Sequence, residues 1–70
     1  MNIDELIRMA NQIARFYTAY PEAEATEGIR NHLRNFWSPH MRERLRQHID
    51  AGAEGLSPLA SQALSGKDPA

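Results

Sequence analysis

The sequence contains no cysteine. Without thiols, the chain forms neither a disulfide nor a thiolate zinc site, and the composition fits a reducing compartment. It also has no valine, and its aromatic residues are limited to one tryptophan, two tyrosines and two phenylalanines. No stretch approaches the ~20 consecutive apolar residues of a membrane-spanning helix. The segment Met1–Glu5 lacks the basic and apolar regions of a signal peptide. We therefore expect a cytoplasmic protein that makes no contact with a membrane.

Residues arranged for catalysis are also missing. No pair of carboxylates, nucleophile with a base or glycine-rich phosphate loop stands at a spacing that catalysis requires. The histidines His32, His40 and His48 follow one another at intervals of eight, whereas metal ligands on a helix usually stand three or four residues apart. We therefore expect no enzyme activity, no bound metal and no cofactor in this chain.

The chain is short, which limits the core that it can build. A domain of 70 residues buries only ~60% of the surface that its unfolded chain exposes. Ten of its apolar residues are alanines, so few large side chains remain for the interior. Small domains without disulfides or metals are commonly stabilised by association. The size and composition therefore favour a single domain that binds a partner.

Hydrophobic periodicity and helix-capping signals predict four helices. They are expected over residues 3–19, 22–37, 39–51 and about 58–64. Asn2 and Glu5 match a capping box before the first helix, while Ser38 and Ser57, each followed by proline, match the caps of the last two. The short connections favour antiparallel neighbours. The predicted fold class is all-α: a small three-helix hairpin bundle over 1–52, then over 53–70 a linker, the short fourth helix and a loose C-terminal tail.

The apolar stripes of the first two helices predict which faces are buried. In the first helix, Met9, Phe16 and Tyr20 widen the apolar arc to about half of the circumference. An arc of this width can contact two neighbouring helices, or it can offer one edge to a partner. The stripe expected to face inward in the second helix consists of Ala25, Ile29, Leu33 and Phe36.

The segment from His32 to Arg42 is the most distinctive part of the sequence, because it holds the only tryptophan, a phenylalanine and a Ser-Pro helix break. Arginine and aromatic residues dominate protein–protein hot spots. Arg30, Arg34 and Trp37 share one face at i, i+4 and i+7. We expect the Trp37 ring to be partly exposed beside Arg34, where a cation–π contact would prepare both for docking.

Residues 30–48 carry five arginines and one glutamate, about +4, while the rest of the chain carries three basic and eight acidic residues, about −5. Three interpretations of this basic segment stay open. It can dock on a protein partner, it can be a solvated face screened by nearby carboxylates, or it can bind nucleic acid. The slightly acidic chain as a whole argues against the last of these.

Three segments resemble the delta subunits of bacterial NAD-dependent, molybdenum-containing formate dehydrogenases. The segments are Ile3-x-x-Leu6-Ile7-x-Met9-Ala10-Asn11-x-Ile13-x-x-Phe16-Tyr17, His32-Leu33-Arg34-x-Phe36-Trp37-x-Pro39-x-Met41-Arg42 and Gly55-Leu56-Ser57-Pro58-Leu59. They occur in the family's order and cover nearly the whole chain. The family often has arginine between the proline and the methionine, where this chain has His40.

The resemblance implies a non-catalytic accessory subunit, without a redox centre, in a cytoplasmic complex that oxidises formate with NAD⁺. The alpha subunit would carry molybdenum bis-pterin guanine dinucleotide and iron–sulfur clusters, and the beta and gamma subunits FMN, the NAD site and further clusters. The chain would bind the alpha subunit and support assembly or stability. Alternatives are a transient chaperone for molybdenum-cofactor insertion or enzyme maturation and, from another class, a free-standing helical regulator that binds nucleic acid.

A docking surface is expected on the second and third helices, with a second contact near the C-terminal motif. The residues assigned to it are Arg30, Arg34, Phe36, Trp37, Pro39, His40, Met41, Arg42, Leu56, Pro58 and Leu59. Replacing Arg34 and Trp37 with alanine is expected to release the subunit while leaving its helicity largely intact.

Overall fold

The computed structural model describes residues 2–65, and within this range all of its regular secondary structure is helical, which confirms the all-α fold class. The elements are α1 (Ile3–Phe16), the short 3-10 helix η1 (Tyr17–Ala19), α2 (Glu22–Phe36), α3 (Pro39–Asp50) and α4 (Pro58–Leu64). These bounds lie close to the expected ranges; the last turn of the first helix is 3-10 instead of α-helical. The predicted loose tail lies, after Ser65, outside the described residues.

Side-chain caps fix where three of the helices begin. The Asn2 side chain accepts a hydrogen bond from the Glu5 amide at 2.9 Å, and the Glu5 carboxylate accepts one from the Asn2 amide at 3.3 Å. The hydroxyls of Ser38 and Ser57 accept from the amides of Met41 and Leu59, each at 3.2 Å. These bonds satisfy amides that have no partner within the helix. The predicted capping residues are therefore confirmed.

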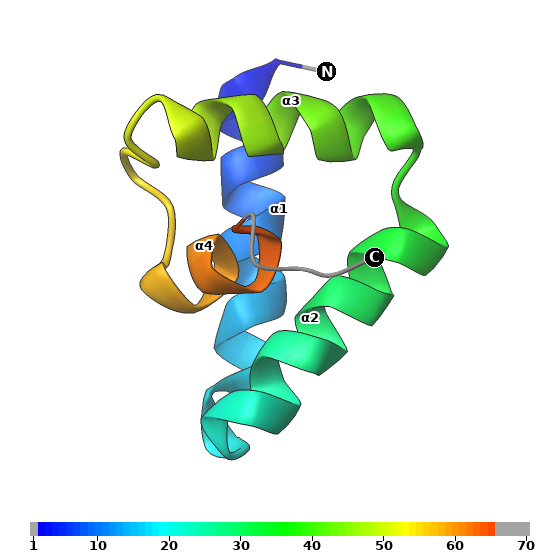
Figure 1. The fold of residues 1–70 in the computed structure, drawn as a ribbon, viewed down its shortest axis with the longest axis vertical. Coiled ribbons are helices and arrows are strands. Elements are labelled where there is room, and N and C mark those ends of the chain that lie inside the picture. The colour runs from blue at the N-terminus through cyan, green and yellow to red at the C-terminus, as the bar shows by residue number, and fades with distance from the viewer. Residues whose placement is uncertain (1, 66–70) are drawn as a thin grey trace.

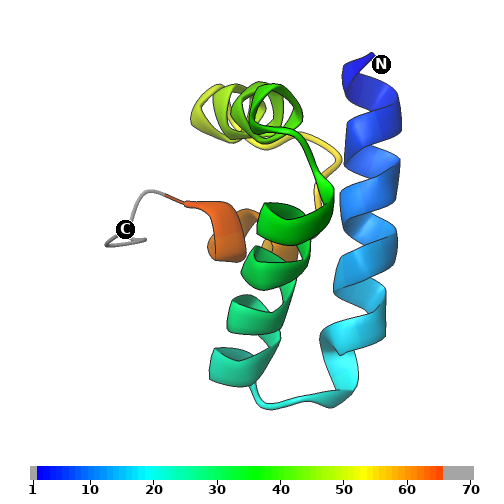
Figure 2. The same cartoon turned by 90° about the vertical axis from the view of Figure 1, so that its right-hand side faces the viewer.

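The first two helices form an antiparallel hairpin, but the third does not continue it (Figure 1). α3 crosses over the N-terminal half of α1, and α4 lies beside α2 beneath α3 (Figures 1 and 2). Within this all-α bundle, α3 therefore lies across the hairpin of α1 and α2 and not antiparallel to α2. The short α4 packs mainly against α2, and α3 packs mainly against α1.

The core draws on all four α-helices. Its fully buried large side chains are Leu6, Ile29, Leu33 and Leu45. Small residues, Ala10 and Ala14 of α1 and Ala60 and Ala63 of α4, are buried with them. Alanine lets helices approach closely, so a chain with few large apolar residues still builds one continuous core. The segment 53–65, expected as a linker and short helix beyond a bundle of residues 1–52, shares this core.

Two polar side chains hold the C-terminal segment onto the hairpin. The amide nitrogen of the Asn11 side chain donates to the Gly55 carbonyl at 2.9 Å, and its oxygen accepts from the Ser57 amide at 2.7 Å. The Arg30 guanidinium, through Nε, donates to the Ala63 carbonyl at 3.0 Å. These long-range bonds position α4 against α1 and α2.

We expect Asn11→Ala to lower the free energy of unfolding by ~1–2 kcal/mol, because it leaves the part-buried Ser57 amide without a partner. Urea denaturation followed by circular dichroism measures the change. Asn35→Ala is the matched control, since Asn35 is exposed on α2 and the same gain in helix propensity applies to both substitutions. Equal stabilities of the two variants would contradict a clamping role for Asn11.

Candidate partner-binding surface

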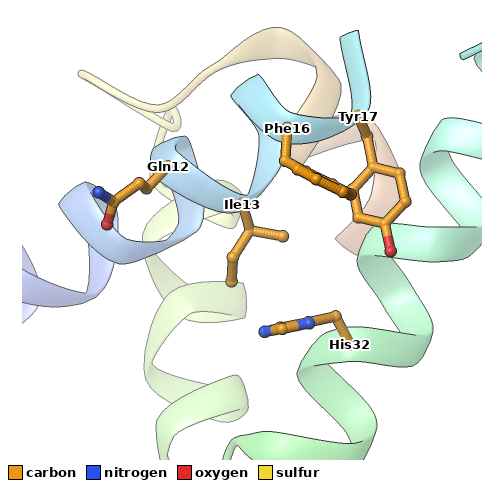
Figure 3. Close-up of a pocket in the computed structure, with 5 residues that line it drawn as sticks. All are labelled: Gln12, Ile13, Phe16, Tyr17 and His32. Carbon is orange, nitrogen blue, oxygen red and sulfur yellow. The ribbon is translucent and has the colours of Figure 1, made fainter. Parts of the chain in front are cut away.

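A groove runs between α1 and α2 on the surface of the hairpin. It is a hollow of about 300 Å³ lined by Gln12, Ile13, Phe16, Tyr17 and His32. Figure 3 shows Ile13 and Phe16 facing His32 across the groove, with the Tyr17 ring at one end. We call this hollow the α1–α2 groove. Its lining is mostly apolar, which is typical of sites that accept an apolar side chain of a partner.

Exposed aromatic rings border the groove. Phe16 is 67% exposed and Phe36 is 73% exposed, and Tyr20 is also exposed, at 46%. In the part of the chain that the structure describes, these are the exposed large apolar side chains. Clusters of exposed apolar rings mark interaction surfaces more often than isolated ones do. The molecule therefore presents an aromatic surface along one side of the hairpin.

The aromatic rings are held in place by contacts with one another. The rings of Phe16 and Tyr17 meet edge to face with centroids 5.1 Å apart, and Tyr17 is followed by Tyr20 at 5.4 Å. On α2, the ring of His32 lies 4.8 Å from that of Phe36. Such pairs reduce the number of side-chain conformations, so less entropy is lost when a partner binds.

The tight turn after α1 directs Tyr17 toward α2. Residues 17–19 form the 3-10 helix, and Pro21 precedes α2. The Tyr17 ring lies directly against Gly28, where an added Cβ would overlap its atoms Cε1 and Cζ. Gly28 thus provides the space for the ring that closes one end of the groove.

The two residues at the end of α2 differ from expectation in opposite directions. Phe36 was expected to face inward, and this is wrong: the buried stripe of α2 ends at Leu33. The predicted partial exposure of Trp37 is also wrong, because only 6% of its surface is exposed and it belongs to the core. The physical reason is that α2 ends at Phe36. Trp37 has an extended backbone (φ −100°, ψ 145°), which places its side chain off the helical stripe and in the core.

The residues assigned to docking from the sequence therefore fall into three groups. The exposed ones are Arg34, Phe36, Pro39, His40 and Pro58. The half-buried ones are Arg30, Met41, Arg42 and Leu59, and the buried ones are Trp37 and Leu56. Arg30, Arg34 and Trp37 do not present one common surface, since Arg30 bonds to α4 and Trp37 lies in the core. Contact of any of these residues with a partner stays a prediction.

Two further hollows are lined by arginines. One of about 260 Å³ lies on α3 and is lined by Pro39, Arg42, Glu43 and Arg46. There the Arg42 Nε atom is buried without a hydrogen-bond partner. The other, of about 240 Å³, lies along α1 and is lined by Arg8, Asn11, Gln12 and Arg15. Guanidinium groups in such positions suit carboxylates of a partner.

The described residues offer no arrangement that would bind a metal ion, because no three histidine, aspartate or glutamate side chains gather within them. Within the same range, no helix has the length and hydropathy to cross a membrane. What the described residues do offer is a mostly apolar hollow with exposed aromatic rings beside it, the α1–α2 groove and its aromatic border.

Sequence reasoning missed most of the groove. Gln12, Ile13, Phe16, Tyr17 and His32 were not among the residues assigned to docking. The signal that pointed to them was the apolar arc of the first helix. Met9, Phe16 and Tyr20 make this arc wider than the part of the helix that is buried in the core. His32 gave no such signal, because its role depends on where α2 lies relative to α1.

Comparison with known proteins identifies a family to which the chain is similar. Residues 5–64 match the family model described as the NADH-dependent formate dehydrogenase delta subunit, FdsD. The match covers α2, α3, α4 and all but the first two residues of α1, including the residues that line the groove. No curated protein and no solved structure is significantly similar to the chain.

Proposed function

The chain belongs to the family of NADH-dependent formate dehydrogenase delta subunits, FdsD, and we propose that it is a non-catalytic accessory subunit that docks on the alpha subunit of that enzyme. The observation that carries the proposal is the α1–α2 groove with its exposed aromatic border. Phe16 and Phe36 expose most of their surface, and neither of them belongs to the hydrophobic core. Exposed apolar surface of this kind is typical of sites that another protein covers.

The docking surface that we propose joins the groove to the corner between α2 and α3. Phe36 belongs to both, since its ring contacts His32 of the groove and the chain continues from it into Ser38 and Pro39. The exposed His40 and the half-buried Arg42 follow in the first turn of α3. Aromatic and arginine side chains side by side are the composition of binding hot spots. Pro58 and Leu59 remain a proposed second contact, while buried Leu56 supports them from the core.

Docking would act on the complex by mass action. A subunit that binds only the assembled alpha subunit stabilises it by an amount set by its concentration relative to its dissociation constant. In this proposal the molybdenum cofactor, the iron–sulfur clusters and FMN belong to the partner subunits, and the complex also contains beta and gamma subunits in the cytoplasm. This chain contributes contact surface and no reacting group.

Native mass spectrometry on the complex isolated through a tagged alpha subunit tests the proposal. We expect this chain at a fixed ratio to the alpha subunit in active, cofactor-loaded enzyme. Deleting the chain is expected to lower the yield or thermal stability of the alpha subunit. Recovery of the chain only with cofactor-free alpha subunit would support a transient maturation chaperone instead, and its absence from all forms of the complex would contradict both.

A further inference from the structure

We propose that the α1–α2 groove receives an amphipathic helix of the partner subunit, whose acidic residues contact Arg8 and Arg15. This inference rests on the proposed function and specifies the partner segment. It concerns one class of occupant, a helix with an apolar stripe and carboxylates beside it. The groove suits such a helix in its shape, in its apolar lining and in the charge along its α1 edge.

The shape of the groove suits a helix. Its walls are two antiparallel helices, so a third helix laid along them would pack in the manner of a helical bundle (Figure 2). An amphipathic helix in an apolar groove is also a recurring mode of recognition, with anchors at i, i+3, i+4 and i+7. The hollow of about 300 Å³ between Ile13, Phe16 and His32 provides the place for a large apolar anchor (Figure 3).

The apolar lining extends beyond the hollow along both helices. On the α1 side the exposed rings continue from Phe16 to Tyr20, and on the α2 side the half-buried His32 is followed by the exposed Phe36. Met9 and Ile13 are partly buried against the core and leave part of their surface uncovered. A single apolar side chain would cover only a small part of this surface, whereas a helix with an apolar stripe would cover it along its length.

After Asp4 and Glu5 of its first turn, the charged residues of α1 are of one sign. Between Glu5 and Glu22 the only charged residues are Arg8 and Arg15. They lie seven residues apart, about two turns or ~10 Å along the helix. Both line the α1 hollow together with Gln12, and Gln12 also lines the groove, so this basic edge borders the apolar lining.

Neither guanidinium is engaged within the described chain. No hydrogen bond or ion pair of the Arg8 or Arg15 side chain is present among residues 2–65. Two unpaired arginines on one edge, with no acidic residue between them, are complementary to carboxylates of a partner. A helix lying in the groove would place acidic residues of its flank within reach of both. This charge complementarity favours an acidic amphipathic helix over a neutral or basic one.

Charge reversal in the intact complex tests the proposal. Arg8→Glu and Arg15→Glu are each expected to weaken binding to the alpha subunit about tenfold, measured by biolayer interferometry with the immobilised complex lacking this chain. Arg44→Glu is the matched control, because Arg44 is exposed on α3 and the substitution changes the net charge equally. Circular dichroism verifies that all three variants fold. Equal affinities of Arg8→Glu, Arg15→Glu and Arg44→Glu would overturn the proposal.

Crosslinking identifies the occupant directly. A photoreactive benzoylphenylalanine in place of Gln12 is expected to crosslink to an alpha-subunit peptide that has helical apolar spacing and carries aspartate or glutamate. A crosslink to a basic or non-helical peptide, or to a second copy of this chain, would overturn the inference while binding to the complex upheld the proposed function. Wild-type chain that does not bind the complex at all would reject the proposed function itself.

Discussion

Replacing Trp37 with alanine is expected to lower the free energy of unfolding of the free chain by ~3–5 kcal/mol. The substitution removes a large side chain that is only 6% exposed, and truncation of a buried tryptophan or phenylalanine typically costs ~3–5 kcal/mol. A domain of 70 residues has a total stability of only ~4–10 kcal/mol. The substitution therefore removes a large fraction of the free energy of unfolding. Urea denaturation and the helical signal in circular dichroism measure it.

Phe36→Ala is the control for this prediction. Phe36 is adjacent in the sequence and also aromatic, but it is 73% exposed, so its truncation is expected to change the free energy of unfolding by less than ~0.5 kcal/mol. A Trp37→Ala variant as stable as the wild type would show that the tryptophan is not part of the core. Replacing Arg34 and Trp37 together removes a buried core side chain, so loss of binding in that variant would not locate the interface.

The second large effect concerns binding. Phe16→Ala and Phe36→Ala are each expected to weaken binding to the alpha subunit about 30-fold, equivalent to ~2 kcal/mol, because both rings would be buried by the partner. Their helicity is expected to remain that of the wild type, since both side chains are mostly exposed in the free chain. Titration of the purified chain into the complex that lacks it, by isothermal calorimetry, gives the dissociation constants.

Gln47→Ala is the reference for these two variants. Gln47 is exposed on α3 and lines neither the groove nor the corner between α2 and α3, so its affinity is expected to stay within twofold of the wild type. Wild-type affinity of both phenylalanine variants would show that the aromatic surface lies outside the interface. Docking would then have to use another face of the chain.

The sequence predicted local structure well because the signals that set it are local. The capping box of Asn2 and Glu5 and the Ser-Pro pairs at Ser38 and Ser57 act within three residues of themselves. They therefore fix the helix starts whatever the rest of the chain does. The all-α fold class follows from these signals and from the helical spacing of apolar residues.

The arrangement of the helices depends on contacts that sequence spacing does not reveal. α3 crosses α1, and α4 is held in place by Asn11 and Arg30 across more than 30 residues of chain. Sequence spacing also failed to show that Phe36 is exposed and Trp37 is buried. Helical periodicity predicts that the buried apolar stripe continues to the last residue of the helix. In the structure, the backbone leaves the helical conformation at Trp37.

The groove could be predicted only in part for the same reason. Its α1 side was indicated by the apolar arc that Met9, Phe16 and Tyr20 widen. Its α2 side, His32, lies 16 residues after Phe16 in the sequence and faces it only because the hairpin brings the two helices together. The spacing of apolar residues in one helix does not show which residue of a second helix faces it.

A cryo-electron microscopy map of the complete formate dehydrogenase complex would test the central claim most directly. The account predicts this chain bound to the alpha subunit, with helical density of the partner lying in the α1–α2 groove against Phe16 and Phe36. A map in which the groove faces solvent while the chain is bound through another surface would contradict it.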